Sequence, residues 1–574
     1  MKQLYRFIAV AGLLVVATVP LLAQLTATLT GNVTSDGAGL PGVTVTISSP
    51  QMQGTRSTTT GEGGAYSFAG LPPGEYTVRF ELAGMQTATR RVQIGVGQTG
   101  RADAALRVAA VAEAITVTAA APSVLETPTV SSNYSAQLVE ELPIPRTPLA
   151  TALLAPGVND STLSANQLTI SGSPGYDNLV MVNGVSITEA VRHQSLNLFI
   201  EDAIQETTVM TGAISAEYGG FTGGVVNSIT KSGGNEFSGS LRDSLTNPDW
   251  TERTPLQRTN NTSNVDTLNQ VWEATIGGYI LRDRLWFFGA GRDTESARTL
   301  SLRPVPGTTT STSFDETTVE QRYEVKLTGQ ITSRHNLAAS YLDVARDISN
   351  TVFTTTSYDL NQLGNRTDPQ ELLSVFYNGV LTNNWMLEGR YSSMDWGVGW
   401  GNGSLFTDVV RGTIVRNRAD GLARYNSPTF CGVCDKETRS NDGYKLQTNY
   451  FLSTRSLGSH NFVAGLETFS EHRYANNYQS GSNYRLFVNS VQRVGDVFYP
   501  TLTPGPGGSA AFLVWTPIFN LQQNESDLKS NSFFINDRWD LNQNFSFSLG
   551  ARFDANDAVD GTGNTVADDQ KISP

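Results

Sequence analysis

The chain contains few of the residues that build catalytic and metal sites. Its 574 residues include 2 cysteines and 4 histidines, so disulfide bonds cannot be the main support of the fold. The histidines lie far in the sequence from both cysteines, which disfavours a zinc site. No Ser/His/Asp or Cys/His arrangement typical of a catalytic site occurs. We therefore expect no enzymatic activity, no bound metal and no cofactor.

Basic residues are outnumbered as well. The 40 lysines and arginines face 53 aspartates and glutamates, which gives a net charge of −13. Nucleic-acid binding needs a basic surface, so we expect no nucleic-acid partner.

Long apolar runs are absent beyond the N-terminus. The run from Phe7 to Leu22 follows Lys2 and Arg6, and it is short for a membrane span. We therefore interpret residues 1–23 as a secretory signal peptide that is cleaved after Ala23. No later stretch is apolar enough for a membrane helix, and the half-apolar strands of an outer-membrane barrel would need none.

Alternating polar and apolar residues dominate the chain from Phe237 onward. In Arg322–Ile331 the odd positions are mostly apolar and the even positions mostly polar, and Asn544–Phe553 repeats the pattern with phenylalanines. Side chains of a strand alternate between its faces, so each segment presents one apolar and one polar surface. The same reasoning predicts about eleven strands in all, near residues 237–245, 269–280, 284–292, 320–331, 335–345, 371–381, 384–396, 443–453, 459–471, 530–540 and 543–553.

The connections distinguish a membrane barrel from a soluble β-structure. Tight turns alternate strictly with long polar connections, the longest of which cover 397–442 and 472–529. This alternation places all the tight turns at one end of the sheet, as in outer-membrane barrels with short periplasmic turns and long extracellular loops. Trp286, Trp396 and other aromatic residues near strand ends would suit interfacial girdles.

Two further β-rich regions precede the barrel. Residues 24–108 contain short strands separated by Gly/Pro turns, which predicts a small β-sandwich. Residues 122–236 mix short helical segments with a hairpin at Asn183-Gly184, where a type I′ turn is expected. The glycine-rich run before Lys231 lacks the spacing of a phosphate-binding loop.

These regions resemble known families. The runs LTGNVTSDGAGLPGVTVTI (29–47) and TTTGEGGAYSFAGLPPGEYTV (58–78) resemble the carboxypeptidase regulatory-like domain, a non-catalytic β-sandwich. The runs SGSPGYDNLVMVNGVSIT (171–188), EAITVTAAAP (113–122) and the 200–241 run resemble the TonB-dependent outer-membrane receptors, within them the Oar-like group. The expected fold is therefore mainly β: the sandwich, an α+β plug over 122–236, and part of a transmembrane antiparallel barrel over 237–574.

The linker over 109–121 contains the β-prone residues Ile115, Thr116, Val117 and Thr118. A short extended peptide can join the edge of a partner's sheet, although an ordinary linker or a last strand of the sandwich would look alike. The resemblance favours the first interpretation, because the family's TonB box lies at this place. It also implies a TonB energy-transducing partner.

The resemblance implies a bacterial outer-membrane receptor that binds an extracellular solute and admits it through the plugged barrel. A siderophore, an oligosaccharide (carbohydrate binding) or a peptide would each suit such a receptor, and outer-membrane lipid would surround it. The alternative is a non-transporting surface or adhesion protein. Cys431 and Cys434 lie in a long loop, where a local disulfide is expected in an oxidising compartment.

The strand count bears on the extent of the barrel. About eleven strands are predicted, whereas the family implies roughly 22 strands around a plugged lumen. Residues 554–574 show no alternation and are expected to form an unfinished loop. The native gene is therefore expected to continue beyond Pro574.

Overall fold

The computed structural model describes most of the chain. It covers residues 27–573 except 50–51, 53–54, 72–73, 96–98, 109–114, 117–129, 162–166, 190–192, 254, 256–257, 259–265, 303–312, 333, 352–359, 361–362, 383, 402–408, 427–436, 455–456, 475–481, 483, 496, 503–512, 518–524 and 543–544. The expected signal peptide lies outside the described residues. Among the described residues, no helix is both long and apolar enough to cross a membrane.

The N-terminal unit is a two-sheet sandwich, as predicted. One sheet consists of β1 (Ala27–Ser35), β2 (Ala38–Gly39), β5 (Ala65–Leu71), β8 (Thr99–Arg101) and β9 (Ala104–Ala105). The other has the order β10-β7-β6-β3-β4 and contains β3 (Thr44–Ser48), β4 (Thr55–Thr59), β6 (Gly74–Glu81), β7 (Ala88–Ile94) and β10 (Ile115–Thr116). Alternate side chains of both sheets, such as Leu29, Val45 and Val78, bury one apolar core between them.

The next unit, the plug, is a mixed sheet with short helices. Its sheet has the order β11-β16-β17-β14-β15 and consists of β11 (Val130–Ser135), β14 (Leu179–Val182), β15 (Val185–Ser186), β16 (Ile204–Gly212) and β17 (Val225–Thr230). The remaining elements are α2 (Ala136–Glu141), α3 (Pro148–Ala152), β12 (Val158–Asp160), β13 (Leu168–Ile170), η2 (Gly175–Asp177) and η3 (Glu201–Ala203). Side chains cap both α-helices: Ser135 accepts a hydrogen bond from the Leu138 amide, and Thr147 accepts one from Ala150.

The third unit is a single antiparallel sheet of thirteen strands. They are β18 (Ser238–Thr246), β19 (Asn269–Leu281), β20 (Leu285–Ser301), β21 (Ser313–Thr332), β22 (His335–Thr351), β23 (Gly364–Thr367), β24 (Gln370–Thr382), β25 (Trp385–Gly401), β28 (Glu437–Ser453), β29 (Ser459–Tyr474), β34 (Glu525–Asp540), β35 (Ser546–Asp560) and β36 (Thr565–Ser573). β23 and β24 share one position, since both pair with β22 and β25. The interruption falls at Pro369, which has no amide hydrogen for the ladder. All eleven strands predicted from the sequence are present.

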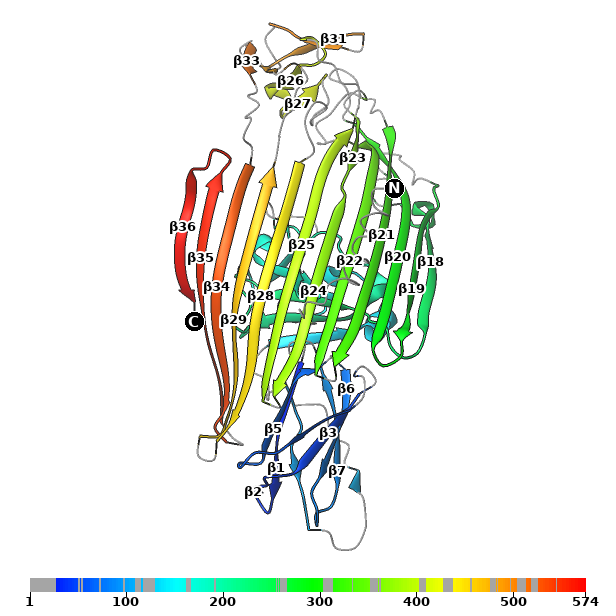
Figure 1. The fold of residues 1–574 in the computed structure, drawn as a ribbon. Helices are drawn as coiled ribbons and strands as arrows, with labels where there is room; N and C mark the ends of the chain where they lie inside the picture. The colour runs from blue at the N-terminus through cyan, green and yellow to red at the C-terminus, as the bar shows by residue number, and fades with distance from the viewer. Residues whose placement is uncertain are drawn as a thin grey trace.

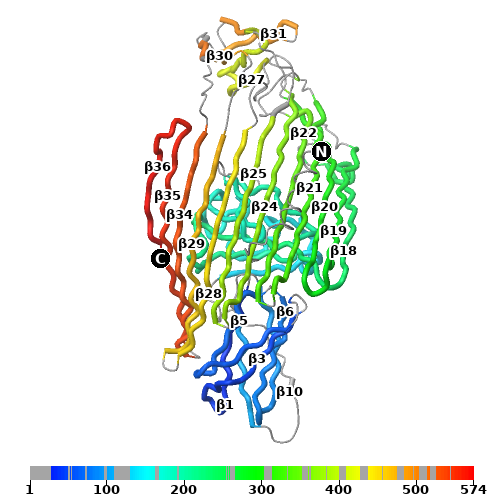
Figure 2. Tube along the Cα trace, in the orientation of Figure 1, coloured from blue at the N-terminus to red at the C-terminus, as the bar shows by residue number. Residues whose placement is uncertain are grey.

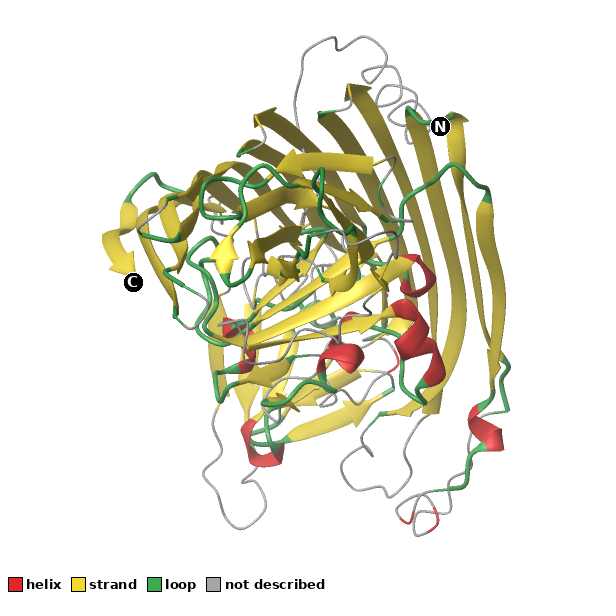
Figure 3. Ribbon diagram, turned by 90° about the horizontal axis from the view of Figure 1, so that it is seen from below, coloured by secondary structure: helices red, strands yellow, loops and turns green. Residues whose placement is uncertain are grey.

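The sheet curves around the plug with its apolar face outward. Tyr323 and Ile331 of β21 are 49% and 56% exposed, whereas Arg322, Glu324 and Lys326 between them are buried against the interior. Polar residues inside and apolar residues outside are the reverse of a soluble protein and fit a lipid-facing wall. Figure 3 shows the plug strands and helices lying within the curve of the sheet.

Three expectations about this sheet were wrong in detail. Residues 554–574 are not a loop: β35 continues to Asp560, and β36 returns beside it. Trp286 does not belong to a girdle, because it is buried and its Nε1 donates to Asn235 Oδ1 at 2.8 Å. Trp396 also faces inward, where the guanidinium of Arg439 lies 4.5 Å from its ring centre.

The two ends of the barrel sheet differ. At the turn end, neighbouring strands are joined by short connections, and the sandwich lies there (Figure 1). Arg101 of the sandwich approaches Asp540 of β34 at 3.7 Å. At the opposite, loop end the strands run beyond their predicted limits, for example to Ser301 in β20, and η4 (Pro248–Trp250) follows β18.

Two of the long loops build a separate unit at the loop end, which we call the cap. It consists of β26 (Ile414–Asn417), η6 (Arg418–Asp420), β27 (Ala423–Tyr425), β30 (Tyr484–Val488), β31 (Val491–Val494), β32 (Val497–Pro500) and β33 (Leu513–Pro517). Four of these strands form a sheet in the order β27-β26-β30-β33. The cap is drawn at the top of Figure 1, beyond the ends of β25 and β28.

Candidate plug–barrel interface and partner segment

The hairpin of β14 and β15 lies at the contact between plug and barrel. Asn183 and Gly184 have φ of 50° and 74°, as the predicted type I′ turn requires. The side chain of Asn183 fixes the end of β17, because its Oδ1 accepts from the Thr230 amide and its Nδ2 donates to Thr230 Oγ1, both at 3.0 Å. Thr230 then meets the barrel wall: its hydroxyl donates to Glu324 Oε1 at 2.7 Å, and its carbonyl accepts from Lys326 Nζ at 3.0 Å.

A group of ion pairs ties η3 to three barrel strands. Glu201 of the plug pairs with Arg292 of β20 at 2.5 Å and lies 3.7 Å from Arg322 of β21. Asp202 pairs with Arg242 of β18 at 2.9 Å. Both plug carboxylates are buried, so the arginines compensate charges that water does not reach.

Further arginines of the barrel bind the plug near β15. Arg390 of β25 donates to the carbonyl of Gly184, in the hairpin turn. Arg439 of β28 pairs with Glu189, and both side chains are buried. Two neighbouring strands of the wall therefore hold the hairpin turn and the segment that follows it.

The plug loop before β17 makes a third polar contact. Lys445 Nζ donates to the Glu217 carbonyl at 3.1 Å, and Arg552 Nη1 lies 3.5 Å from the same oxygen. The amide of Ala216 donates to Asn536 Oδ1 at 3.0 Å. These contacts reach β28, β34 and β35, so the plug is bound from β18 to β35 along the wall.

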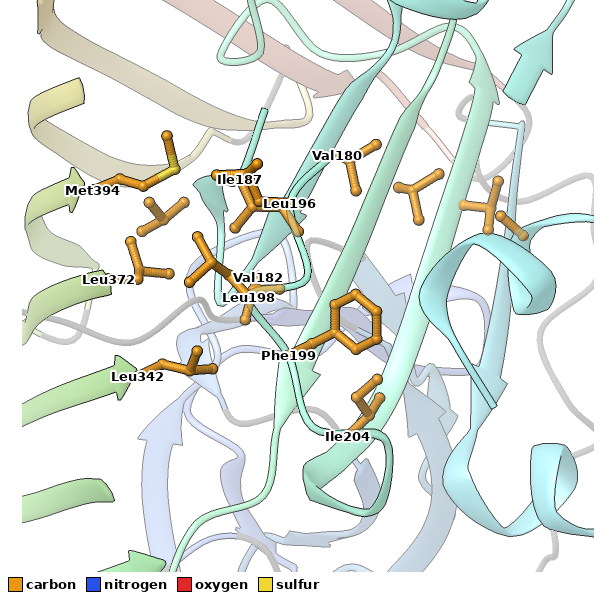
Figure 4. Packing of buried hydrophobic residues seen from close by; sticks show 14 of the residues in the cluster. Val180, Val182, Ile187, Leu196, Leu198, Phe199, Ile204, Leu342, Leu372 and Met394 are labelled. Atoms are coloured by element: carbon orange, nitrogen blue, oxygen red, sulfur yellow. The ribbon is translucent and has the colours of Figure 1, made fainter. Parts of the chain in front are cut away.

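One apolar patch complements these polar contacts. Leu342, Leu372 and Met394 project inward from β22, β24 and β25 against plug residues such as Ile187 and Leu198 (Figure 4). The barrel residues come from adjacent strands at matching heights, since Leu372 pairs with both Leu342 and Met394. The patch keeps water from part of the interface.

The hydrogen bonds between plug and barrel are individually weak, so they can be broken one by one. A hydrogen bond between protein groups contributes only about 0.5–1.5 kcal/mol net, because water can replace either partner. The hydrogen bonds that fix the plug are thus separate contacts that water could replace one at a time, whereas the buried ion pairs cost more to break. Sequence reasoning had assigned the inward charges of β21 to a polar wall and did not find their plug partners, because they lie about 90–120 residues away along the chain.

The structure describes some of the residues that the sequence proposed as sites. Ile115 and Thr116 form β10, which pairs in parallel with Ala88 and Thr89 at the edge of the sandwich; Figure 2 shows β10 beside this unit. Val117, Thr118, Cys431 and Cys434 lie outside the described residues. The described part of the chain has no group of three or more His, Cys, Asp or Glu side chains that could hold a metal ion.

Comparison with known proteins identifies the units. Residues 28–107 match the carboxypeptidase regulatory-like domain, and residues 123–226 match the TonB-dependent receptor plug domain. The chain therefore contains a plug domain of the TonB-dependent receptor type. It is 30% identical over 262 residues to the TonB-dependent transporter Oar of Myxococcus xanthus, which covers 43% of this chain and 24% of that protein.

Solved structures of two outer-membrane proteins share the fold. The outer membrane transporter YddB from Escherichia coli has a TM-score of 0.54 and 14% identity, covering 78% of this chain and 58% of its own. The siderophore receptor PirA from Acinetobacter baumannii has a TM-score of 0.51 and 16% identity, covering 74% and 56%. The chain thus spans less than two thirds of the length of these relatives.

The plug match and the shared fold connect the chain with outer-membrane β-barrel receptors, which are not an enzyme class. In such barrels the short turns lie on the periplasmic side and the long loops on the extracellular side. The turn end of this sheet corresponds to the first side and the cap to the second.

Proposed function

We propose that this receptor binds an extracellular solute and admits it past the plug with energy from a periplasmic TonB complex. The observation that carries the proposal is the interface between plug and barrel. The plug is a separate folded unit, and charged side chains on the inner face of the barrel bind it through ion pairs and hydrogen bonds. Glu201 with Arg292 and Glu189 with Arg439 are examples. Such a plug is held firmly at rest and released by force without any covalent step. A siderophore, an oligosaccharide or a peptide remains the expected class of solute.

The segment Ile115–Thr118 is the proposed contact with TonB. Its first two residues are extended and already pair with a sheet edge, which supports a role in strand addition to a partner. The pairing covers only Ile115 and Thr116 opposite Ala88 and Thr89. Because only two residues of β10 pair with the sandwich, the segment can leave this edge and form a longer strand pairing with TonB.

We further propose the domain limits given by the sequence: a signal peptide over 1–23, the sandwich over 24–108, the linker over 109–121, the plug over 122–236 and the barrel from 237. The limits after residues 108, 121 and 236 fall between described elements, which supports them. The family matches at 28–107 and 123–226 lie within the second and fourth of these ranges.

A disulfide between plug and barrel tests the proposed function. A Cβ atom built on Gly550 of β35 would lie 3.2 Å from the Cβ of Ala216 in the plug, close to the separation of roughly 3.5–4.5 Å that a disulfide requires. The nearest obstacle is Asn536 Oδ1, which ends a side chain that can rotate. We expect Ala216→Cys with Gly550→Cys to bind solute normally and to lose energised uptake until a reductant is added.

The assay compares uptake of a labelled siderophore, oligosaccharide and peptide in cells with and without TonB. Each single cysteine variant is the control, and both should transport as the parent does. Uptake that continues in the oxidised double variant would show that the plug need not move.

The alternative function is adhesion without transport. It is favoured by the cap, a folded unit outside the barrel. It predicts surface attachment that neither TonB nor the disulfide affects.

A further inference from the structure

The sandwich contacts the turn end of the barrel sheet through glycines and one arginine. A Cβ atom built on Gly61, in the connection before β5, would lie 3.5 Å from the Cβ of Ser453 at the end of β28. Met386 of β25 lies so close to Gly70 that an added Cβ would collide with its sulfur. Figure 1 shows the sandwich at the lower ends of the barrel strands. We call the contacting set of the sandwich the docking face: Gly61, Gly63, Gly70, Gly95 and Arg101.

The contact between the sandwich and the barrel wall is weaker than that between the plug and the wall. A cavity of about 80 Å³ lies between the sandwich and the barrel, with Tyr66 on one side and Ser459 on the other, and it is large enough for several water molecules. The ion pair of Arg101 with Asp540 is long, at 3.7 Å, and both side chains are partly exposed, so it contributes little. Wet, polar contacts of this kind allow two domains to separate.

The docking face also contacts the plug, at the ladder that the linker enters. A Cβ atom built on Gly95 would collide with Asn133 Nδ2 of β11 and would lie 3.0 Å from Glu206 Oε1 of β16. Asn133 pairs with Thr208 of β16, and Glu206 pairs with Ser135 of β11. Gly95 thus contacts both strands of one ladder, and the docked sandwich supports their pairing.

The linker is attached to both the sandwich and the plug. At one end, Val108 forms a β-bridge with Met85 of the sandwich; at the other, Val130 begins β11 of the plug. The segment Ile115–Thr118, the proposed contact with TonB, lies between these ends. A pull on this segment therefore acts on the sandwich as well as on the plug, and the unit that is attached more weakly to the wall detaches first.

The sandwich can leave the wall as one body. Its two sheets bury a core of their own, which includes Leu29, Val45 and Phe80, and a domain with its own core moves as a unit. The docking face consists of glycines and Arg101, which are not part of this core. Undocking therefore leaves the core of the sandwich intact.

We propose that the sandwich is a releasable latch of the plug. While the sandwich is docked at the turn end, Gly95 holds β11 against β16; when the sandwich leaves the wall, β11 is free to separate. Detachment of the sandwich is therefore the first step of energised opening, which gives this non-catalytic domain a function. The latch rests on the proposed function in one respect, namely that a partner pulls on Ile115–Thr118.

Hydrogen exchange of the full chain in detergent tests the latch without TonB and without solute. The release variant is Gly95→Leu with Arg101→Ala. Its leucine displaces the ends of the Asn133 and Glu206 side chains, which can rotate, and its alanine removes the ion pair with the barrel. We expect the amides of 130–135 to exchange at least about tenfold faster, because opening of β11 no longer requires undocking.

Two controls separate undocking from damage to the sandwich. In the release variant, peptides from the sandwich core at 27–35 and 74–81 should exchange as in the parent, which shows that the sandwich remains folded. Arg79→Ala breaks an ion pair with Glu81 that lies within the sandwich and is exposed. It should leave exchange at 130–135 unchanged.

A disulfide between sandwich and barrel gives the complementary test. Gly61→Cys with Ser453→Cys places two Cβ atoms 3.5 Å apart, a separation that a disulfide permits. When oxidised, this pair should abolish TonB-dependent uptake of the labelled siderophore, oligosaccharide or peptide until a reductant is added. The matched control is Thr46→Cys with Ser57→Cys, because these hydroxyl oxygens lie 2.9 Å apart within the sandwich. A bond between them leaves the sandwich free to undock, so the control should transport as the parent does.

Two results would overturn the latch: equal exchange at 130–135 in the release variant and the parent, and normal uptake by the oxidised sandwich–barrel disulfide. Failure of the latch is distinguishable from failure of the proposed function. If Ala216→Cys with Gly550→Cys stops uptake but the sandwich–barrel disulfide does not, the plug moves without undocking and only the latch is wrong. If the parent shows no TonB-dependent uptake, the proposed function is wrong, and hydrogen exchange still decides whether the sandwich holds β11.

Discussion

Removal of Arg439 should loosen one part of the plug by a predictable amount. Arg439 contacts Glu189 of the plug and Glu437 of its own strand, and its guanidinium stacks on Trp396 at 4.5 Å. The side chain of Glu189 is only 1% exposed. Arg439→Ala therefore leaves a buried carboxylate without its arginine, for which the cost is about 3–5 kcal/mol.

The plug segment that carries Glu189 should show this loss as faster hydrogen exchange. Its amides are held locally, since Glu189 N donates to the Gln194 carbonyl and Leu196 N to the Ile187 carbonyl, at 3.0 and 2.8 Å. If opening of this segment breaks the ion pair, a loss of about 3 kcal/mol accelerates exchange roughly a hundredfold. Mass spectrometry of deuterated peptides covering 185–200 measures the effect.

Two further variants make this test specific. Arg79→Ala is the control, because Arg79 of the sandwich pairs with Glu81 at 2.6 Å and both side chains are exposed, at 57% and 43%; an exposed pair contributes about 0–1 kcal/mol. Adding Glu189→Gln to Arg439→Ala should recover part of the protection, since a buried amide costs less than a buried carboxylate. Unchanged exchange at 185–200 in Arg439→Ala would refute the view that ion pairs fix the plug.

Two predictions concern residues identified from the sequence. Val117→Pro should leave folding and membrane insertion intact and abolish TonB-dependent uptake, because proline lacks the backbone donor of a paired strand; normal uptake would place the contact elsewhere. Cys431 and Cys434 should be joined in the assembled protein, and mass spectrometry of unreduced peptides would contradict this if both thiols were alkylated.

The barrel strands were predictable because the alternation of polar and apolar residues that defines them lies within each strand. A strand with lipid on one side must alternate, so Arg322–Ile331 identified both a strand and its two faces. The loop-side extensions were not predictable, because beyond the membrane both faces meet water and alternation is no longer required. β36 was missed because most of its residues, Thr565–Ser573, are polar and its apolar residues do not alternate with them.

The contacts of the site were not predictable because they are non-local. Nothing near Glu189 in the sequence indicates Arg439, which lies 250 residues later. The orientation of the aromatic residues was not predictable for the same reason. Trp286 lies near a strand end, as a girdle residue would, but its side chain faces inward because its indole nitrogen donates a hydrogen bond to Asn235. In the cap, the neighbours of Arg416 result from the parallel pairing of β26 with β30. These strands come from two different loops, and no pattern in the sequence predicts that they pair.

The order of the plug sheet suggests where a pull from the linker would act first. The linker enters the plug at β11, an edge strand that pairs only with β16 in the described sheet. Its first residue, Val130, pairs with Gly212, so a force from the linker would break the ladder one pair at a time from that end. β17 lies deeper in the sheet and carries the contacts of Thr230 with Glu324 and Lys326. Sequential loss of β11 therefore requires less force than displacement of the anchored strands, and a path along the wall could open while most of the ion pairs stay intact.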